Sequence, residues 1–190
     1  MSASIFEQVD EIVAEAAAPA RRHIATRALG WLSEVADQPQ LISICAGTVL
    51  IGLAGRNRRL MRAGARMFLA ELLDTGMKSA VKHHVDRTRP RVVDDGGAYA
   101  MHGGDSDESA LNSFPSGHTA GAVTVARALA REYSKLRGAA YGTAAAVARI
   151  QVPRCQHYPT DLAAGAVIRL FAEQIVNEAV GWSQSMRPQS

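Results

Sequence analysis

The stretch SFPSGHTAGA, residues 113–122, decides the class of fold that the sequence predicts. Pro115 is of a type favoured at the first position of a helix, and the small residues that follow His118 favour a closely packed helix. Gly117 allows a ligand to approach the backbone, and the free N–H groups of a helix start form an anion site. The hydroxyl of Ser116 adds a further donor. Taken alone, the stretch is also compatible with an ordinary helix start beside a histidine.

Helical patterns extend outward from this stretch along most of the chain. Within residues 4–18, apolar residues recur at helical spacing with acidic residues between them, which predicts an amphipathic helix. Further helices are expected at residues 20–36, 40–55, 58–84, 116–136, 138–151 and 160–182. The 190 residues suffice for one domain, and hydrophobic residues make up 47% of them with only 5% aromatic. The predicted class is all-α, a bundle of about five to six core helices with an amphipathic N-terminal helix.

One long connection interrupts the helical pattern. Residues 91–114 contain the segments DDGG and HGGDSDES, and glycine and acidic residues at that density indicate a loop. A loop of this length in a compact domain is either functional or disordered. The sequence shows no strand-like alternation.

The charge of the chain excludes little. The net charge is +3, and the basic residues are not gathered into one tract, so we expect no nucleic-acid partner. Acidic residues near the N-terminus stand where an export signal would carry lysine or arginine, so no cleavable signal is expected.

Membrane character rests on one segment and on two basic turns. Residues 38–55 are free of charge over a length close to the spanning minimum of about 18 to 20 residues. Hydropathy alone supports a soluble bundle about as well as an integral membrane protein. With antiparallel helices, the basic turns at residues 55–66 and 131–138 fall at one end of the bundle. Basic loops tend to stay cytoplasmic, so in a membrane the opposite end would face away from the cytoplasm.

Two further segments at that opposite end carry candidate site residues. The segment KHHVDRTRP holds Lys82 and Arg89, seven residues apart. Both can point at one anion if the helix continues for two turns. In RCQHYPTD, His157 and Asp161 are four residues apart. A carboxylate one helical turn away can hold the Nδ1–H of an imidazole and leave Nε2 free as a nucleophile or base.

Taken together, Lys-x6-Arg-Pro, Pro-Ser-Gly-His and His-x3-Asp occur in an order that resembles the PAP2 family. This family comprises the type 2 phosphatidic acid phosphatases and is related to the vanadium haloperoxidases. The likeness covers residues 40–180 and continues in HYPTDLAAGAVI. It implies a bundle that hydrolyses phosphate esters through a phosphohistidine, with no metal and no cofactor. By resemblance, His157 would be the nucleophile, Asp161 would orient it, and His118 would protonate the leaving alcohol and then activate water.

The phosphate-binding residues follow from the same resemblance, with one departure. Those expected to hold the phosphoryl oxygens are Lys82, Arg89, Ser116 and Gly117. The family's third motif places an arginine six residues before the nucleophilic histidine, but Gln151 stands there. Arg149 is favoured for this role, because ARI is similar to the family motif and a two-residue insertion in the following turn costs little. Arg154 is the alternative.

The resulting prediction is a phosphatase that hydrolyses a phosphate monoester or diphosphate of a lipid. Its expected setting is an inner or plasma membrane of the bacterial type, with the site facing away from the cytoplasm. The alternatives are a soluble or peripheral acid phosphatase on small phosphate esters, a vanadate-dependent haloperoxidase and a non-catalytic anion-binding membrane module. We divide the chain into interfacial helices at residues 1–38, a PAP2-type domain at residues 39–182 and a tail at residues 183–190.

Overall fold

The computed structural model describes residues 4–185, so the last five residues of the expected tail lie outside the described part. The helices are α1 (Ile5–Ala17), α2 (Ile24–Ser33), α3 (Gln38–Ala54), α4 (Arg58–Lys82), α5 (Pro90–Asp94), α6 (Gly117–Glu132), α7 (Arg137–Ile150) and α8 (Pro159–Ser185). Short 3-10 turns cover Ala18–Arg22, Glu34–Ala36 and Ser134–Leu136. The all-α class predicted from the sequence is confirmed.

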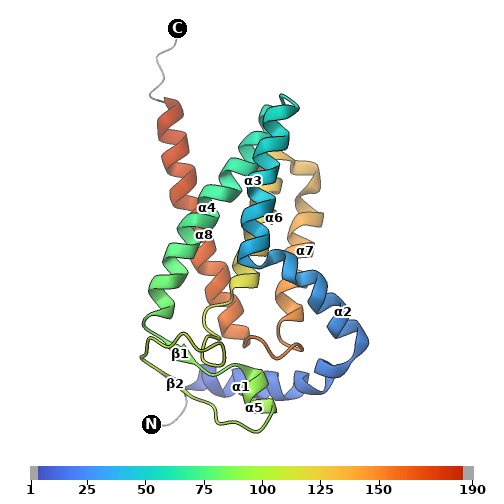
Figure 1. Cartoon of the computed structure of the whole chain (residues 1–190), viewed down its shortest axis with the longest axis vertical. Helices are drawn as coiled ribbons and strands as arrows, with labels where there is room; N and C mark the ends of the chain where they lie inside the picture. Colours follow the sequence, from blue (N-terminus) through green and yellow to red (C-terminus); the bar gives the residue numbers. More distant parts are fainter. Residues whose placement is uncertain (1–3, 186–190) are drawn as a thin grey trace.

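The core is a bundle of α3, α4, α6, α7 and α8 (Figure 1). Helix α4 packs against α3, α6 and α8, and α6 packs in addition against α7 and α8. Small residues allow these close approaches. A Cβ added at Gly52 of α3 would lie 2.5 Å from the backbone nitrogen of Met61, and one at Gly64 of α4 would lie 2.7 Å from that of Val49. The alanine and glycine content therefore determines how closely the helices pack.

Charged residues are buried inside the bundle as well. Arg169 of α8 is fully buried, and its guanidinium lies 3.5 Å from a carboxylate oxygen of Glu71. Asp74, also fully buried, forms an ion pair of 2.7 Å with Lys78 one turn further along α4. These pairs explain why charges interrupt the helical patterns of the sequence, because buried charges are tolerated when they are paired.

The membrane span expected at residues 38–55 is not found. Among the helices of residues 4–185, none combines the length and the apolar character that crossing a bilayer requires. Helix α3 has 17 residues.

The segment after α4 differs from the prediction of a continued helix and a structureless loop. Helix α4 ends at Lys82, and the chain passes into β1 (Asp86–Arg87), which pairs antiparallel with β2 (Met101–His102). Helix α5 then begins at Pro90. Lys82 and Arg89 therefore do not share a helix face. The cause is the strand pairing of residues 86 and 87, which is a long-range contact that helical spacing does not reveal.

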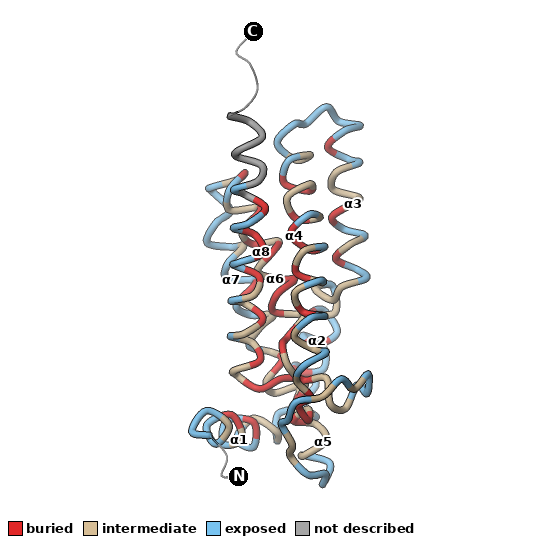
Figure 2. The backbone as a smooth tube through the Cα atoms, turned by 90° about the vertical axis from the view of Figure 1, so that its left-hand side faces the viewer, coloured by how far each residue is buried: buried red, intermediate tan, exposed pale blue. Residues whose placement is uncertain are grey.

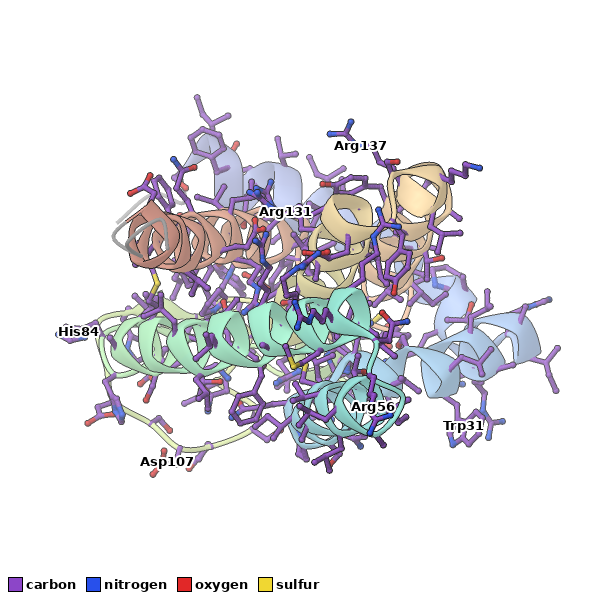
Figure 3. All side chains as sticks on the ribbon, turned by 90° about the horizontal axis from the view of Figure 1, so that it is seen from above. Trp31, Arg56, His84, Asp107, Arg131 and Arg137 are labelled. Atoms are coloured by element: carbon purple, nitrogen blue, oxygen red, sulfur yellow. The ribbon has the colours of Figure 1, made fainter. Side chains whose placement is uncertain are left out.

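The two ends of the bundle differ in character. The α3–α4 and α6–α7 turns lie together at one end, opposite the strands and α5 (Figure 1). Arg56, Arg131 and Arg137 belong to these turns and are seen from above in Figure 3. The predicted grouping of both basic turns at one end agrees with the structure. At the other end, α1 lies across the base of the bundle, and buried backbone is concentrated along α6 and α8 (Figure 2).

Candidate active site

The PSGH segment begins α6 and is joined to α8. Ser116 is the N-cap residue, so Pro115 precedes the cap rather than occupying the first helical position. The Ser116 side chain accepts a hydrogen bond from the backbone N–H of Thr119, and its own backbone N–H donates to the carbonyl oxygen of Asp161 at 3.0 Å. A Cβ at Gly165 would lie 2.3 Å from the carbonyl oxygen of Ser116. Glycine at that position therefore allows α8 to approach the start of α6.

His157 is buried immediately before α8 and has a defined tautomer. Its Nδ1–H donates to the backbone carbonyl oxygen of Ser113 at 2.7 Å. A carbonyl oxygen only accepts, so the proton resides on Nδ1 and Nε2 carries the lone pair. The nearest carboxylate oxygen of Asp161 is 3.8 Å from Nδ1, beyond hydrogen-bonding distance. The direct hydrogen bond expected between Asp161 and His157 is thus replaced by one to Ser113.

Asp161 remains the charged neighbour of His157. Its carboxylate accepts hydrogen bonds from the Ser113 hydroxyl at 2.6 Å, the Tyr158 backbone N–H at 2.8 Å and the Arg87 guanidinium at 2.6 Å. Burial raises the pKa of Asp161, but the adjacent His157, Arg87 and Ser113 outweigh it, so that this pKa is below its usual value. Burial lowers the pKa of His157, Arg89 lowers it further, and Asp161 opposes both. These shifts favour a neutral imidazole beside a charged carboxylate.

His118 faces the same site from the first turn of α6. Its ring centroid is 6.2 Å from that of His157, and its Nε2 is 3.5 Å from a carboxylate oxygen of Glu34. Burial lowers the pKa of His118, while the charges of Asp37 and Glu34 partly offset that effect. The two imidazoles are therefore placed for a shared reaction but have different partners.

Arg89 brings a positive charge close enough to His157 to lower the pKa of that histidine. Its guanidinium donates to the carbonyl oxygens of Ser109 at 2.7 Å and Asn112 at 3.0 Å, and to the side-chain oxygen of Gln156 at 2.9 Å. These acceptors are neutral, so they orient the guanidinium without cancelling its charge. Burial lowers the pKa of Arg89, and the neighbouring charge of Arg91 adds to this effect.

Lys82 lies near Arg89 although the two residues are not on one helix. Burial lowers the pKa of Lys82, and the charge of Arg89 is the next largest contribution. Lys82 lines a cavity of 270 Å³ together with Lys78, Asn112 and Gly117. The cavity links the first motif to the start of α6, as an anion bound between them would require.

The two arginines that are candidates for the third motif, Arg154 and Arg149, have different surroundings. Gln151 is fully buried, and its amide donates to the hydroxyl of Ser33 at 3.1 Å. Arg154 donates to the same hydroxyl at 2.9 Å and forms an ion pair with Glu34. The positive charge of Arg154 contributes to lowering the pKa of His118. Arg154 and His118 therefore share Glu34 as a charged neighbour.

Arg149 lies elsewhere. It is exposed on α7 and lines a groove with apolar residues of α1 and α2, among them Val13 and Leu29. The sequence favoured Arg149 through the likeness of ARI to the family motif, whereas in the structure it is Arg154, in the turn that follows α7, that pairs with Glu34.

One group in the described part of the chain has the spacing of metal ligands. Ligand atoms of Glu34, Asp37 and His118 lie within 4.8 Å of one another. Glu34 is already paired with Arg154, so a cation here would compete with the guanidinium.

Several site residues were not identified from the sequence. They are Asp10, Glu34, Arg87, Ser113 and Gln156. Arg87 had a usable signal, because it lies in the first motif two residues before Arg89. Ser113 acts through its backbone carbonyl and Glu34 from a distant turn, so neither has a local signature.

Comparisons with known proteins identify the fold and the family. The fold resembles the crystal structure of the first transmembrane PAP2-type phosphatidylglycerolphosphate phosphatase from Bacillus subtilis, with a TM-score of 0.64. That match has 16% sequence identity and covers 99% of this chain and 90% of the other. No curated protein matches the chain in sequence. The family model of the PAP2 superfamily matches residues 59–183, which include every motif described above. The protein therefore belongs to the PAP2 superfamily, and family and fold together support a phosphatase.

Proposed function

We propose that the protein is a metal-independent phosphatase that hydrolyses a phosphate monoester or diphosphate of a lipid through a phosphohistidine intermediate. The observation that carries this proposal is the tautomer of His157. With the proton of Nδ1 held by the Ser113 carbonyl at 2.7 Å, the lone pair of Nε2 is available for attack.

The reaction proceeds in two balanced steps. Nε2 of His157 attacks phosphorus, a phosphorus–nitrogen bond forms, and the bond to the leaving oxygen breaks while protonated His118 donates a proton to that oxygen. His118 then accepts a proton from water, whose oxygen attacks phosphorus and breaks the phosphorus–nitrogen bond. Asp161 stays ionised and stabilises the positive charge that develops on His157.

The phosphoryl oxygens are bound by cations and by the start of α6. Lys82 and Arg89 supply positive charge, and the backbone N–H groups of Gly117 and His118 supply hydrogen bonds. The Ser116 hydroxyl accepts from Thr119 and still has its own proton to donate. We assign the third-motif role to Arg154 rather than Arg149, because Arg154 forms an ion pair with Glu34, whose carboxylate lies 3.5 Å from His118, whereas Arg149 is exposed on α7.

A lipid substrate is favoured by an apolar groove beside the catalytic end. The groove has a volume of 550 Å³ and lies between α3, α6 and α7. Ala122, one turn after His118, lines it together with Ala36, and leucine and valine side chains continue the lining toward Leu136. An acyl chain could occupy it while the headgroup reaches the histidines.

A membrane partner is favoured by the exposed apolar residues of the N-terminal helices. The most exposed are Ile5, Phe6, Ile12, Ile24 and Trp31. They belong to α1 and α2, which lie at the end of the bundle that carries the strands (Figure 1), and Trp31 points outward in Figure 3. In a membrane, the basic turns would lie toward the cytoplasm and the active site away from it. The structural neighbour, named as a transmembrane phosphatase, is consistent with this setting.

The proposal is tested by phosphate release in detergent with EDTA present, using phosphatidate, phosphatidylglycerolphosphate, polyprenyl diphosphate and one soluble ester. We expect release from at least one lipid, loss of release in His157→Ala, and no change in His102→Ala, whose imidazole is exposed in β2. Complete loss with EDTA would contradict the metal-independent step. Turnover of the soluble ester alone would support the acid-phosphatase alternative, and peroxide-driven bromination with added vanadate would support a haloperoxidase.

A further inference from the structure

Helix α1 reaches the active-site carboxylate through a chain of buried charges. The Arg87 guanidinium donates to Asp10 of α1 at 2.7 Å and to Asp161 of α8 at 2.6 Å. Asp10 and Arg87 are each 1% exposed, and Asp161 is fully buried. Asp10 is thus the one strongly polar residue that the otherwise amphipathic α1 buries in the described part of the chain.

Thr160, at the start of α8, forms hydrogen bonds with both Asp10 and Arg87. Its backbone N–H donates to one carboxylate oxygen of Asp10 at 3.1 Å, and its hydroxyl donates to the other. The Thr160 hydroxyl also accepts from Arg87 at 2.8 Å. The face of the Tyr158 ring lies 4.2 Å from the Arg87 guanidinium carbon. These contacts leave the guanidinium little freedom to rotate.

The charge balance explains why a second carboxylate is needed. The buried carboxylates of Asp10 and Asp161 share the single guanidinium of Arg87. Arg87 therefore orients Asp161 while the three groups together keep one net negative charge. If Asp10 were uncharged, Arg87 would lose the anchor on its far side, and its guanidinium would have only Asp161 as an ionic partner. Breaking one member of a buried network of this kind displaces the others, because each remaining charge must find a new partner.

We propose that Asp10 is a positioning residue of the active site, acting through Arg87 to hold the carboxylate of Asp161 beside His157. The inference rests on the proposed function, in which His157 is the nucleophile. Asp10 lies outside residues 59–183, the part that the family model matches. The N-terminal helix is then a component of the active site in addition to an interfacial helix.

The first test is amide hydrogen exchange in the full chain, comparing Asp10→Asn with Glu15→Gln. Both changes remove one carboxylate charge from α1, but Glu15 is exposed. The reporter is the Tyr158 amide, which donates to Asp161 at 2.8 Å. We expect its exchange to accelerate about tenfold in Asp10→Asn and not in Glu15→Gln. Unchanged exchange at Tyr158, or an equal increase at all core amides, would overturn the proposal.

The second test is steady-state kinetics on the same samples, with the folded fraction measured by circular dichroism. For Asp10→Asn, we expect kcat to fall about tenfold with KM within about twofold, as for outer-sphere partners of catalytic groups. Wild-type kcat in Asp10→Asn would overturn the proposal while leaving the phosphatase function intact. A wild-type chain that releases no phosphate, while Tyr158 still responds to Asp10→Asn, would overturn the phosphatase function and leave the positional link supported.

A second variant covers the case in which Asp10→Asn fails to fold. Thr160→Val is nearly isosteric and removes only the hydroxyl shared by Asp10 and Arg87. We expect the same two changes with smaller amplitude, about threefold in each. Wild-type values in both measurements would overturn the inference.

Discussion

Replacing Gly165 with alanine tests whether close contact between α8 and the PSGH segment is needed for activity. The added Cβ would lie 2.3 Å from the carbonyl oxygen of Ser116 and 3.2 Å from its carbonyl carbon, whereas real Cβ contacts essentially never fall below 3.0 Å. The obstacle is backbone, which cannot rotate away, so the two segments must separate by about 0.7 Å. That movement pulls on the hydrogen bond from Ser116 N–H to the Asp161 carbonyl oxygen.

The expected magnitudes follow from this displacement. Overpacking costs about 1–3 kcal/mol in the free energy of unfolding. Alanine in a helix returns about 1 kcal/mol relative to glycine, so the net loss is about 0–2 kcal/mol. A misplacement of about 1 Å can cost 100-fold in rate, so we expect kcat/KM to fall between about 10-fold and 100-fold. Activity should thus be damaged much more than stability.

The assay is phosphate release from the best lipid of the screen, with denaturant unfolding on the same samples. Gly142→Ala in α7 is the matched control, because a Cβ there meets nothing within 4 Å. It should raise the free energy of unfolding by up to about 1 kcal/mol and leave kcat/KM unchanged. A Gly165→Ala enzyme with kcat/KM within about twofold of wild type would refute the reasoning, because α8 would then tolerate the displacement.

Four further predictions concern charge. Burial lowers the pKa of His118 below 6.5, and a general acid must be protonated, so kcat should decline as the pH rises through a value on the acid side of 6.5. The Glu34 charge raises the pKa of His118, so Glu34→Gln should shift this decline to lower pH in a kcat–pH titration, and an unshifted profile would exclude the contact. In phosphate-release kinetics, Arg154→Gln should lower kcat/KM about 100-fold, whereas Arg149→Gln should leave kcat/KM near the wild-type value. A large loss in Arg149→Gln with little change in Arg154→Gln would return the third-motif role to Arg149. Arg169→Met removes the cation that lies beside the buried carboxylates of Glu71 and Asp74. It should lower the free energy of unfolding, measured by urea titration, by about 3–5 kcal/mol. A loss below about 1 kcal/mol would show that Arg169 contributes little to stability.

Sequence reasoning worked where the signal was local. Helical spacing located the helices within a few residues, because a helix depends on contacts between neighbours three and four positions apart. The condition that placed Lys82 and Arg89 on one helix face is not met, because residues 86 and 87 pair with residues 101 and 102 as strands. The charge-free run at residues 38–55 forms a helix of 17 residues, and no helix of the described residues has the length and apolar character of a membrane span.

Some features of the fold and of the candidate site follow from the sequence, and others depend on the tertiary structure. By itself the sequence determined the all-α class, the close helix packing made possible by alanine and glycine, and the three motifs that mark the family. The tertiary structure alone decided that the Ser113 carbonyl oxygen, rather than Asp161, accepts the hydrogen bond from Nδ1–H of His157. It also decided that Glu34 links Arg154 to His118, and that Asp10 reaches Asp161 through Arg87. The reason is physical: a motif specifies residue types over a few positions, whereas the atoms that meet depend on how helices far apart in the chain cross and pack.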